Sequence, residues 1–227
     1  MTQHPGALRH SVTRRKWVRL ASQTATAIAL PALSLGWGSA LAQAAAPRRL
    51  TPAQSEGPFY PDKIPTDTDF DLLRNGARSY ARGEAAWVSG SVLDLGGKPV
   101  SGAAVEIWQC DADGHYHHAG DGDRADPAFQ GFGRVVVGAD GAYRFRTLRP
   151  VAYSGRAPHI HVKVKLGNRE LLTTQLYVAG APANERDGLW RRVRDAQDRE
   201  ALTVPFVPSA EGLQARFARL EPLYRLP

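Results

Sequence analysis

The residues most able to do chemistry lie close together, between Tyr153 and His161. This segment brings together a phenol, the guanidinium of Arg156 and the imidazoles of His159 and His161. From His159 onward polar and apolar residues alternate as they do in a β-strand, so both imidazoles should point to one face and Ile160 to the other. Two imidazoles with this spacing can reach one metal ion.

A second tyrosine, Tyr116, lies upstream, shortly after Trp108. Phenols ionise near about pH 10 in water, so they bind a metal at neutral pH only when the ion is strongly polarising. Ferric iron is such an ion and favours anionic oxygen, whereas tyrosine is not a usual zinc ligand. With two phenolates and one hydroxide the ferric site would be neutral, which lowers the cost of burying it. These residue types favour iron.

Each of these side chains also has an ordinary structural interpretation. The two histidines can be polar residues on a wet sheet face, and a single tyrosine is more often a core or surface residue than a ligand. Arg156 is either a solvated arginine or a fixed positive charge beside the metal that stabilises a substrate. Gln175 makes either a sheet hydrogen bond or a contact to the same substrate. Aspartates between positions 111 and 126 do not match an EF-hand, so we interpret them as solvated turns.

The first 46 residues differ in composition from the rest. They hold five basic residues and no acid, followed by a mildly apolar run over 20–42 that ends in Ala40-Leu41-Ala42. This pattern is typical of a cleavable export leader, and the run 13–19 is similar to a twin-arginine signal. We expect residues 1–44 to be that signal and the mature protein to be periplasmic or otherwise exported, with no stable membrane insertion after cleavage. An uncleaved membrane anchor is the alternative.

Charge and cysteine content narrow the function further. The formal net charge of +7 falls to +2 when the five positive charges of the leader are removed. The basic character therefore belongs mostly to the leader and does not indicate nucleic-acid binding. Because Cys110 is the single cysteine, an internal disulfide is excluded. A core of roughly 180 mature residues has to hold the fold, with help from any bound metal.

The mature chain divides into an arm and a β-rich domain. Residues 45–85 are rich in Pro, Asp, Gly and Arg without a sustained period, which predicts an extended N-terminal arm. Residues 86–227 contain short β-like runs bounded by turn residues, at 87–94, 103–109, 133–137, 143–145, 159–166 and 171–178. This spacing predicts an all-β fold, a β-sandwich core with long active-site loops.

Two turn signals and two less regular segments complete the expected topology. Asp140-Gly141 and Gly167-Asn168 separate neighbouring runs as they do in β-hairpins. Residues 184–200 are charged with a weak helical stripe, so we expect a loop with one short helix. Residues 213–220 fit either a helix or a strand.

Segments in order from residue 51 to residue 178 resemble the intradiol ring-cleavage dioxygenases. This is the non-haem Fe(III) family that includes protocatechuate 3,4-dioxygenase and catechol 1,2-dioxygenase. Because the similarity extends over most of the mature chain, it is more specific than any single motif. The matching pieces include 51–60, 90–94, 105–109, 114–116, 140–145, 156–161 and 172–177.

The resemblance implies a β-sandwich with long loops around a ferric ion. Four residues match the iron ligands of the family: Tyr116, Tyr153, His159 and His161. Arg156 and Gln175 match the polar residues beside the substrate, and Tyr153 matches the ligand that gives way to it. The implied partners are a small aromatic diol and O₂, and the implied reaction cleaves the ring between its hydroxyl-bearing carbons to give a muconate-type diacid.

Two other functions stay open from the residues alone. The strand and turn pattern of 90–103 and 140–145 also occurs in transthyretin-like sandwich domains, which would make the chain a non-catalytic binding module. Such domains have no reason to carry Tyr116 or the segment 156–161. A hydrolase with zinc on the two histidines is the third hypothesis. The sequence leaves the oligomeric state open, a homo-oligomer included.

Overall fold

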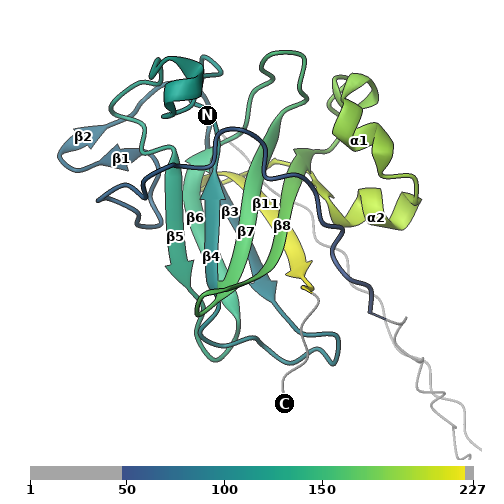
Figure 1. The fold of residues 1–227 in the computed structure, drawn as a ribbon. Helices are drawn as coiled ribbons and strands as arrows, with labels where there is room; N and C mark the ends of the chain where they lie inside the picture. Colours follow the sequence, from purple (N-terminus) through teal and green to yellow (C-terminus); the bar gives the residue numbers. More distant parts are fainter. Residues whose placement is uncertain (1–47, 223–227) are drawn as a thin grey trace, which may run out of the picture. The chain divides into compact units, whose positions relative to one another are not determined.

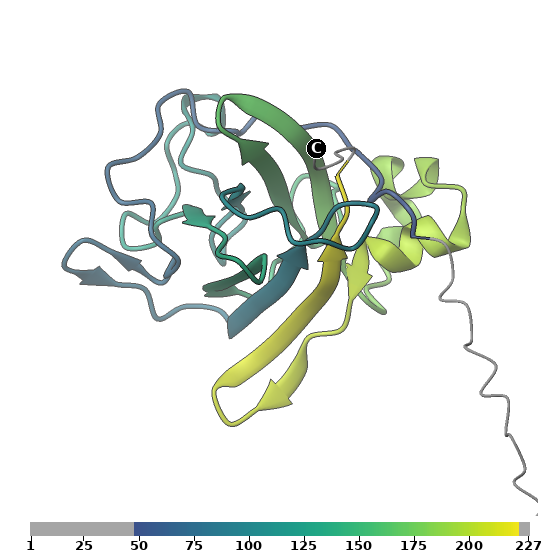
Figure 2. The same ribbon diagram turned by 90° about the horizontal axis from the view of Figure 1, so that it is seen from below.

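The structure is a computed structural model that describes residues 48–222. The predicted export signal, residues 1–44, lies outside this range. The described part of the chain folds mainly into two β-sheets that face each other, with few and short helices (Figures 1 and 2). The prediction of a β-sandwich core is therefore confirmed for these residues.

The first sheet has five strands in the order β5-β4-β7-β8-β9. The strand β7 lies at its centre and forms the predicted hairpin with β8 across Gly167-Asn168. Antiparallel pairs join β5, β4, β7 and β8, and β9 adds a short parallel edge. The strands are β5 (Phe132–Val136), β4 (Ala104–Trp108), β7 (His159–Leu166), β8 (Arg169–Val178) and β9 (Thr203–Val204).

The second sheet has four strands in the order β10-β11-β3-β6. These are β10 (Val207–Ser209), β11 (Gly212–Leu220), β3 (Ala85–Val92) and β6 (Ala142–Leu148). Residues 213–220 thus form a strand, which pairs in parallel with β3 and buries Ala215 and Phe217. This settles the choice between helix and strand, because the alternate residues of 213–217 face the core.

The prediction of a β-hairpin at Asp140-Gly141 is wrong. The turn exists, but β5 belongs to the first sheet and β6 to the second, so the chain crosses here between the two layers. Gly141 has a φ of +68°, and a Cβ on it would lie 2.7 Å from the carbonyl oxygen of Val92. The glycine therefore serves a close approach to β3 rather than a hairpin turn.

The core between the sheets is apolar and well buried. Val88 of β3, Phe145 of β6 and Ile107 of β4 are fully buried there, as are Ile160 and Val162 of β7. The opposite face of β7 is buried as well, although it carries polar side chains. One face of β7 packs against the second sheet, and the arm covers the other face.

The arm crosses the outer face of the five-stranded sheet (Figure 1). Its backbone pairs with β8, since Gln54 N–H donates to the Thr173 carbonyl at 2.9 Å. The hydroxyl of Thr174 donates to the Pro52 carbonyl at 2.7 Å. Further along, a small hairpin follows, formed by β1 (Arg74–Asn75) and β2 (Arg78–Ser79). The arm is therefore part of the packed domain, and Leu72 from it enters the core.

Residues 184–200 contain more helix than expected. After the 3₁₀ turn η2 (Asn184–Arg186) come α1 (Gly188–Arg192) and α2 (Ala196–Ala201), so the prediction of one short helix is wrong. Aspartates at their N-caps, Asp187 and Asp195, accept hydrogen bonds from the first free N–H groups. Caps rather than apolar stripes define these helices. None of the helices in residues 48–222 is long and apolar enough to cross a membrane.

The loop between β4 and β5 contains the 3₁₀ turn η1 (Ala119–Asp121) and is organised by a buried aspartate. Asp111 accepts hydrogen bonds from the backbone N–H groups of Asp113, His115 and Asp126 at 2.9–3.0 Å. Its side chain is fully buried. The interpretation as a solvated turn is therefore wrong for Asp111, which shapes the loop that carries Tyr116.

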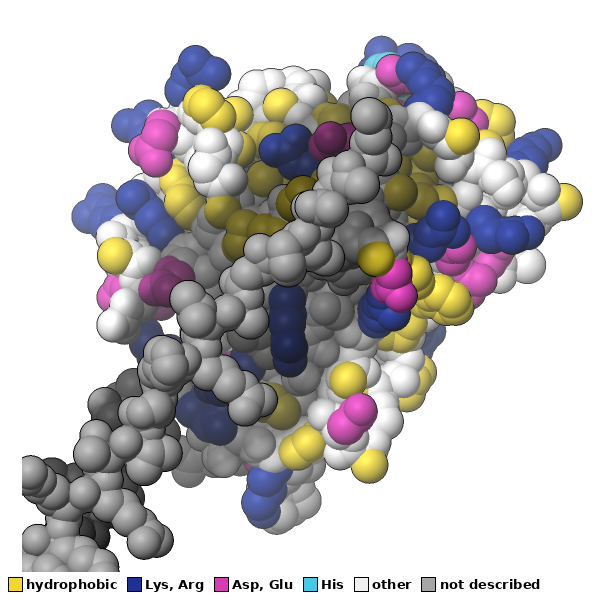
Figure 3. Space-filling model, turned by 180° about the vertical axis from the view of Figure 1, so that it is seen from behind, with side chains coloured by type: hydrophobic (Ala, Val, Ile, Leu, Met, Phe, Trp, Pro, Cys, Tyr) yellow, Lys and Arg dark blue, Asp and Glu magenta, His cyan; other side chains and the backbone are white. Residues whose placement is uncertain are grey.

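The outer face of the four-stranded sheet carries charges of both signs. Arg144 pairs with Glu211, and Arg146 pairs with Asp71 at 3.0 Å. Figure 3, the view from behind, shows acidic side chains beside several of the basic ones. The positive charge on this face is thus partly neutralised by neighbouring carboxylates.

We expect Phe145→Ala to lower the free energy of unfolding by about 3–5 kcal/mol, because it opens a cavity between the sheets. Val136→Ala is the control, since the Val136 side chain on β5 is 64% exposed. Its cost should stay within about 0.5 kcal/mol. Urea unfolding followed by circular dichroism measures both, and equal losses would contradict the placement of the core.

Candidate metal centre and substrate site

The register of the five-stranded sheet sets three site residues in one row. Trp108 of β4 lies opposite His161 of β7, and His161 lies opposite Gln175 of β8. Directly opposed residues point to the same face of a sheet. His159 is two residues earlier on β7, opposite Tyr177. The sandwich core, which takes Ile160 on the other face, thus fixes all of these side chains on the outer face under the arm.

The two histidines meet as the sequence predicted. Their Nε2 atoms lie 3.1 Å apart, and both rings are fully buried. His159 Nδ1 lies 2.6 Å from the carbonyl oxygen of Ala157. Because a carbonyl can only accept, Nδ1 carries the proton, and the Nε2 lone pair of His159 faces His161. Trp108 stacks on His161 with 4.8 Å between the ring centroids.

Both imidazoles are neutral at neutral pH. Burial, followed by the positive charge of Arg156, lowers the pKa of His159 to about 4. Burial, followed by the proximity of His159 and Arg156, lowers the pKa of His161 well below its ordinary value. Neutral imidazoles keep a nitrogen lone pair, which is the form in which histidine binds a metal.

The two tyrosines complete a cluster of four rings. The centroid of Tyr116 lies 5.1 Å from that of Tyr153 and 6.0 Å from that of His161, and Tyr153 lies 5.4 Å from His159. Burial raises the pKa of Tyr116 well above its ordinary value. Burial also raises the pKa of the half-buried Tyr153, despite the nearby charge of Arg156. Ionisation of either phenol near pH 7 therefore requires a cation in the cluster.

Two glycines permit the close approach of the segments that form the cluster. Gly57 of the arm has a φ of +77°, and a Cβ on it would lie 3.3 Å from His161 Cε1. Gly114 has a φ of +85°, and a Cβ on it would lie 3.1 Å from the Cβ of Tyr153. Both positions combine a left-handed backbone with a crowded neighbour, so both favour glycine.

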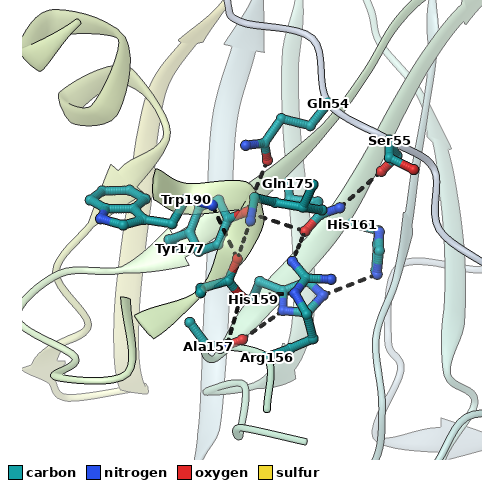
Figure 4. Close-up of polar contacts among 11 residues, drawn as sticks. Gln54, Ser55, Arg156, Ala157, His159, His161, Gln175, Tyr177 and Trp190 are labelled. Carbon is teal, nitrogen blue, oxygen red and sulfur yellow. Dashed lines mark hydrogen bonds and ion pairs between the residues drawn. The ribbon is translucent and has the colours of Figure 1, made fainter. Parts of the chain in front are cut away.

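Arg156 and Gln175 lie together beside the histidines, as Figure 4 shows. Arg156 Nη2 donates to Gln175 Oε1 at 2.5 Å, and Gln175 Nε2 donates to the Ser55 carbonyl of the arm at 2.8 Å. The hydroxyl of Tyr177 donates to Gln54 Oε1 at 3.1 Å. The glutamine is thus held from both of its amide atoms, by Arg156 and by the arm.

Sequence reasoning missed several residues of this network. Asp187, whose Oδ2 accepts from Arg156 Nε at 2.8 Å, lies in a segment that we expected to be mainly loop. Gln54 and Tyr177 lie inside segments that match the family, but neither was singled out. The sequence signal for Asp187 is its place as an acidic residue before a short helical stretch, a weak signal without the structure.

Two clefts reach the cluster. One of about 280 Å³ is lined by Phe59, Trp108 and Tyr116 among others. Phe59 stacks on Tyr116 with 4.6 Å between the ring centroids, so the Phe59 ring forms one wall of this cleft. The other cleft, of about 240 Å³, is lined by Tyr153, Arg156, Ala183 and Arg186 among others. Arg156 and Tyr153 thus border one opening together.

The four rings fit a hard cation. In the described part of the chain, the buried hydroxyl of Tyr116 has no hydrogen-bond partner outside the cluster of four rings, an arrangement that costs free energy unless something binds there. Within residues 48–222 no group of three or more His, Cys, Asp or Glu side chains could hold a metal. A metal at the two histidines would therefore need phenol oxygens as its other protein ligands, and ferric iron accepts these.

Comparisons with known proteins indicate the family of the chain. A family model described as "Dioxygenase" matches residues 55–196. The protocatechuate 3,4-dioxygenase beta chain of Burkholderia cepacia is 39% identical over 141 residues, which cover 56% of this chain and 59% of that protein. Hydroxyquinol 1,2-dioxygenase of Corynebacterium glutamicum is 34% identical over 153 residues, covering 60% and 48%. The chain thus spans only about half to three-fifths of these relatives.

A solved structure shows the same fold. The dioxygenase domain of a dioxygenase carbohydrate-binding protein fusion from Streptomyces sp. SirexAA-E is 32% identical, with a TM-score of 0.59 over 76% of this chain and 99% of that one. The chain belongs to the intradiol ring-cleavage dioxygenase family. The family is one of enzymes, which favours an enzyme over the alternative of a non-catalytic transthyretin-like module.

We expect Asp187 to make stability depend on pH in the acid range. Burial alone would raise the pKa of Asp187, but hydrogen bonds from the backbone of Ala157 and Trp190 and from Arg156 outweigh it and hold this pKa below its ordinary value. A carboxyl whose pKa is lower in the folded state stabilises the protein above the unfolded pKa of about 3.9, and the gain is lost as pH falls through the folded pKa.

Urea unfolding from about pH 5 downward measures this contribution. Asp187→Asn should show a shallower loss of unfolding free energy with falling pH than the wild type. A variant that keeps the full wild-type slope would mean that Asp187 is not held as a carboxylate.

Proposed function

We propose that the chain is a non-haem Fe(III) dioxygenase. It cleaves a catechol-type ring with O₂ between the two hydroxyl-bearing carbons and yields a muconate-type diacid. The observation that carries this proposal is the convergence of two phenols and two neutral imidazoles beside a guanidinium, in a member of this family.

Four side chains would hold the iron: Tyr116, Tyr153, His159 and His161. When bound, ferric iron would act as a Lewis acid that draws electron density from the diol ring and makes it reactive toward O₂. Tyr116 is only 2% exposed, which suits a permanent ligand. Tyr153 is half-buried and borders a cleft, so its Oη, as a phenolate, would be the one able to accept a proton from a substrate hydroxyl.

We place the diol in the cleft that Tyr153 and Arg156 border. The Arg156 guanidinium and the Gln175 amide lie on the side of the histidines where the ring would bind. As negative charge develops on the ring and its oxygens, a fixed guanidinium stabilises it without reorganisation. Neighbouring aromatic side chains, among them Phe59 and Trp108, limit the water around the ligand cluster.

We expect the purified protein to contain iron, to be red from phenolate-to-iron charge transfer, and to consume O₂ with a catechol-type diol. An oxygen electrode and a panel of catechol, protocatechuate, hydroxyquinol and gallate measure activity and substrate preference together. A colourless, iron-free protein that consumes no O₂ with any of these would overturn the proposal and favour a zinc enzyme or a binding module.

Tyr153→Phe tests whether the two tyrosines have different roles. It should lower kcat by roughly 100-fold or more, because it removes a proton acceptor, and it should change the visible spectrum. Tyr116→Phe is the comparison, and we expect it to lose iron, since it removes the buried ligand. Wild-type turnover and colour in Tyr153→Phe would assign the proton transfer to another group.

We also propose that residues 1–44 export the protein by the twin-arginine route, on the basis of the basic front, the apolar run and the small-residue cleavage site. Replacement of both Arg14 and Arg15 with Lys should leave uncleaved protein inside the cell, while the wild type appears, shortened, in the periplasmic fraction. Immunoblots of the two fractions distinguish these outcomes, and unchanged export of the double variant would exclude this route.

A further inference from the structure

A fully buried carboxylate connects helix α1 to the substrate side of the site. Asp187 is 0% exposed, and each of its oxygens accepts two hydrogen bonds. Oδ1 accepts from the backbone N–H groups of Leu189 and Trp190 at 2.8 and 3.0 Å. Oδ2 accepts from Arg156 Nε and from the backbone N–H of Ala157, both at 2.8 Å. One side chain thus caps the helix and holds the segment just before His159.

We propose that Asp187 is a positioning residue that fixes the orientation of the Arg156 guanidinium toward the diol, an inference that rests on the proposed function. Asp187 binds Nε of the guanidinium, and Gln175 binds Nη2. Two bonds at different nitrogens of a planar group leave it no free rotation. Of the five N–H groups of the guanidinium, these two bonds use one on Nε and one on Nη2, so N–H groups on Nη1 remain for a ligand.

Arg156 and Asp187 differ in burial, as expected if Asp187 positions the arginine without touching the substrate. The Arg156 side chain is 22% exposed and borders the cleft, while the carboxylate of Asp187 lies behind it, inaccessible to solvent. The carboxylate therefore cannot reach a substrate, and it acts only through the arginine. It also balances the arginine charge, so the pair adds little net charge to the cleft.

The helix that Asp187 caps is packed against the five-stranded sheet. Trp190 of α1 packs edge-on against Tyr177 of β8, with 5.1 Å between the ring centroids. Tyr177 in turn donates to Gln54 and contacts Gln175 Oε1 at 3.3 Å. Gln175 is itself a residue of β8, and Asp187 together with Trp190 links Arg156 to the same strand. Helix α1, which is too short to be stable alone, gains a role as the seat of Asp187.

Asp187→Asn tests this role with almost no change in size. Both carboxylate oxygens accept two N–H groups each, so an amide must turn its own NH₂ toward one of these donor pairs. We expect kcat and kcat/KM to fall together by roughly 10- to 100-fold, because misplacement of a group that acts in the transition state costs this much. Iron content and the visible band should stay at wild-type levels, because the four ligands are untouched.

Asp195→Asn is the matched control. Asp195 caps α2 in the same manner, accepting from the backbone of Gln197 and Asp198, but it is exposed and contacts no residue of the site. This variant should lose some stability and keep wild-type kcat. Equal, small effects of both variants on turnover would overturn the proposal and reduce Asp187 to a helix cap.

A double-mutant cycle with Arg156→Ala shows whether Asp187 acts through the arginine. Turnover of the double variant should equal that of Arg156→Ala alone, and multiplying losses would contradict positioning. Thermal unfolding of the same four proteins can be measured without turnover. The Tm shifts of the two single variants should add up to more than the Tm shift of the double variant. If the wild type has no iron and no activity, the proposed function fails, whereas simply additive unfolding shifts would sink the inference about Asp187 by itself.

Discussion

The site depends on the cover that the N-terminal arm gives to the outer face of the five-stranded sheet. A strand such as β7 would normally bury one face and leave the other to water. Here Gln54 pairs with β8 and Gly57 closes over His161, so the polar face becomes as dry as the core. Removal from water keeps the imidazoles neutral, with a lone pair free for a metal, and keeps the phenols protonated as long as no cation lies beside them.

The same desolvation separates the ionisable groups into two sets. The two phenols and two imidazoles are uncharged in the absence of a bound cation. Arg156 and Asp187 are both charged, and they stay so because each is bonded to the other at 2.8 Å. A buried pair of this kind is weak support for stability, since its attraction has to offset two desolvation costs. Its value here lies in holding a guanidinium still beside the place where charge would develop.

Much of the arrangement could be predicted from residue spacing, because a sheet converts sequence alternation directly into faces. The run 159–164 fixed the two histidines on one face, and the turn at Gly167-Asn168 fixed the partner strand. Spacing says nothing about a segment without a period, so the contacts of Ser55 and Gln54 needed the structure. Asp187 was hidden for a related reason: a helix of five residues is defined by its cap and its packing, not by an apolar stripe. The crossing at Asp140-Gly141 depends on which sheet each strand joins, and that is decided by distant partners.

The parallel pairing of β11 with β3 bears on the order in which this chain becomes structured. β3 starts at Ala85, whereas the strand that covers its edge begins only at Gly212. Until those late residues have been synthesised, β3 has β6 on one side and an open row of backbone donors and acceptors on the other. Contacts this remote in the chain form slowly, and an unpaired edge invites association with other chains meanwhile. A nascent molecule that already displays all four proposed iron ligands would thus still lack the strand that closes its second layer.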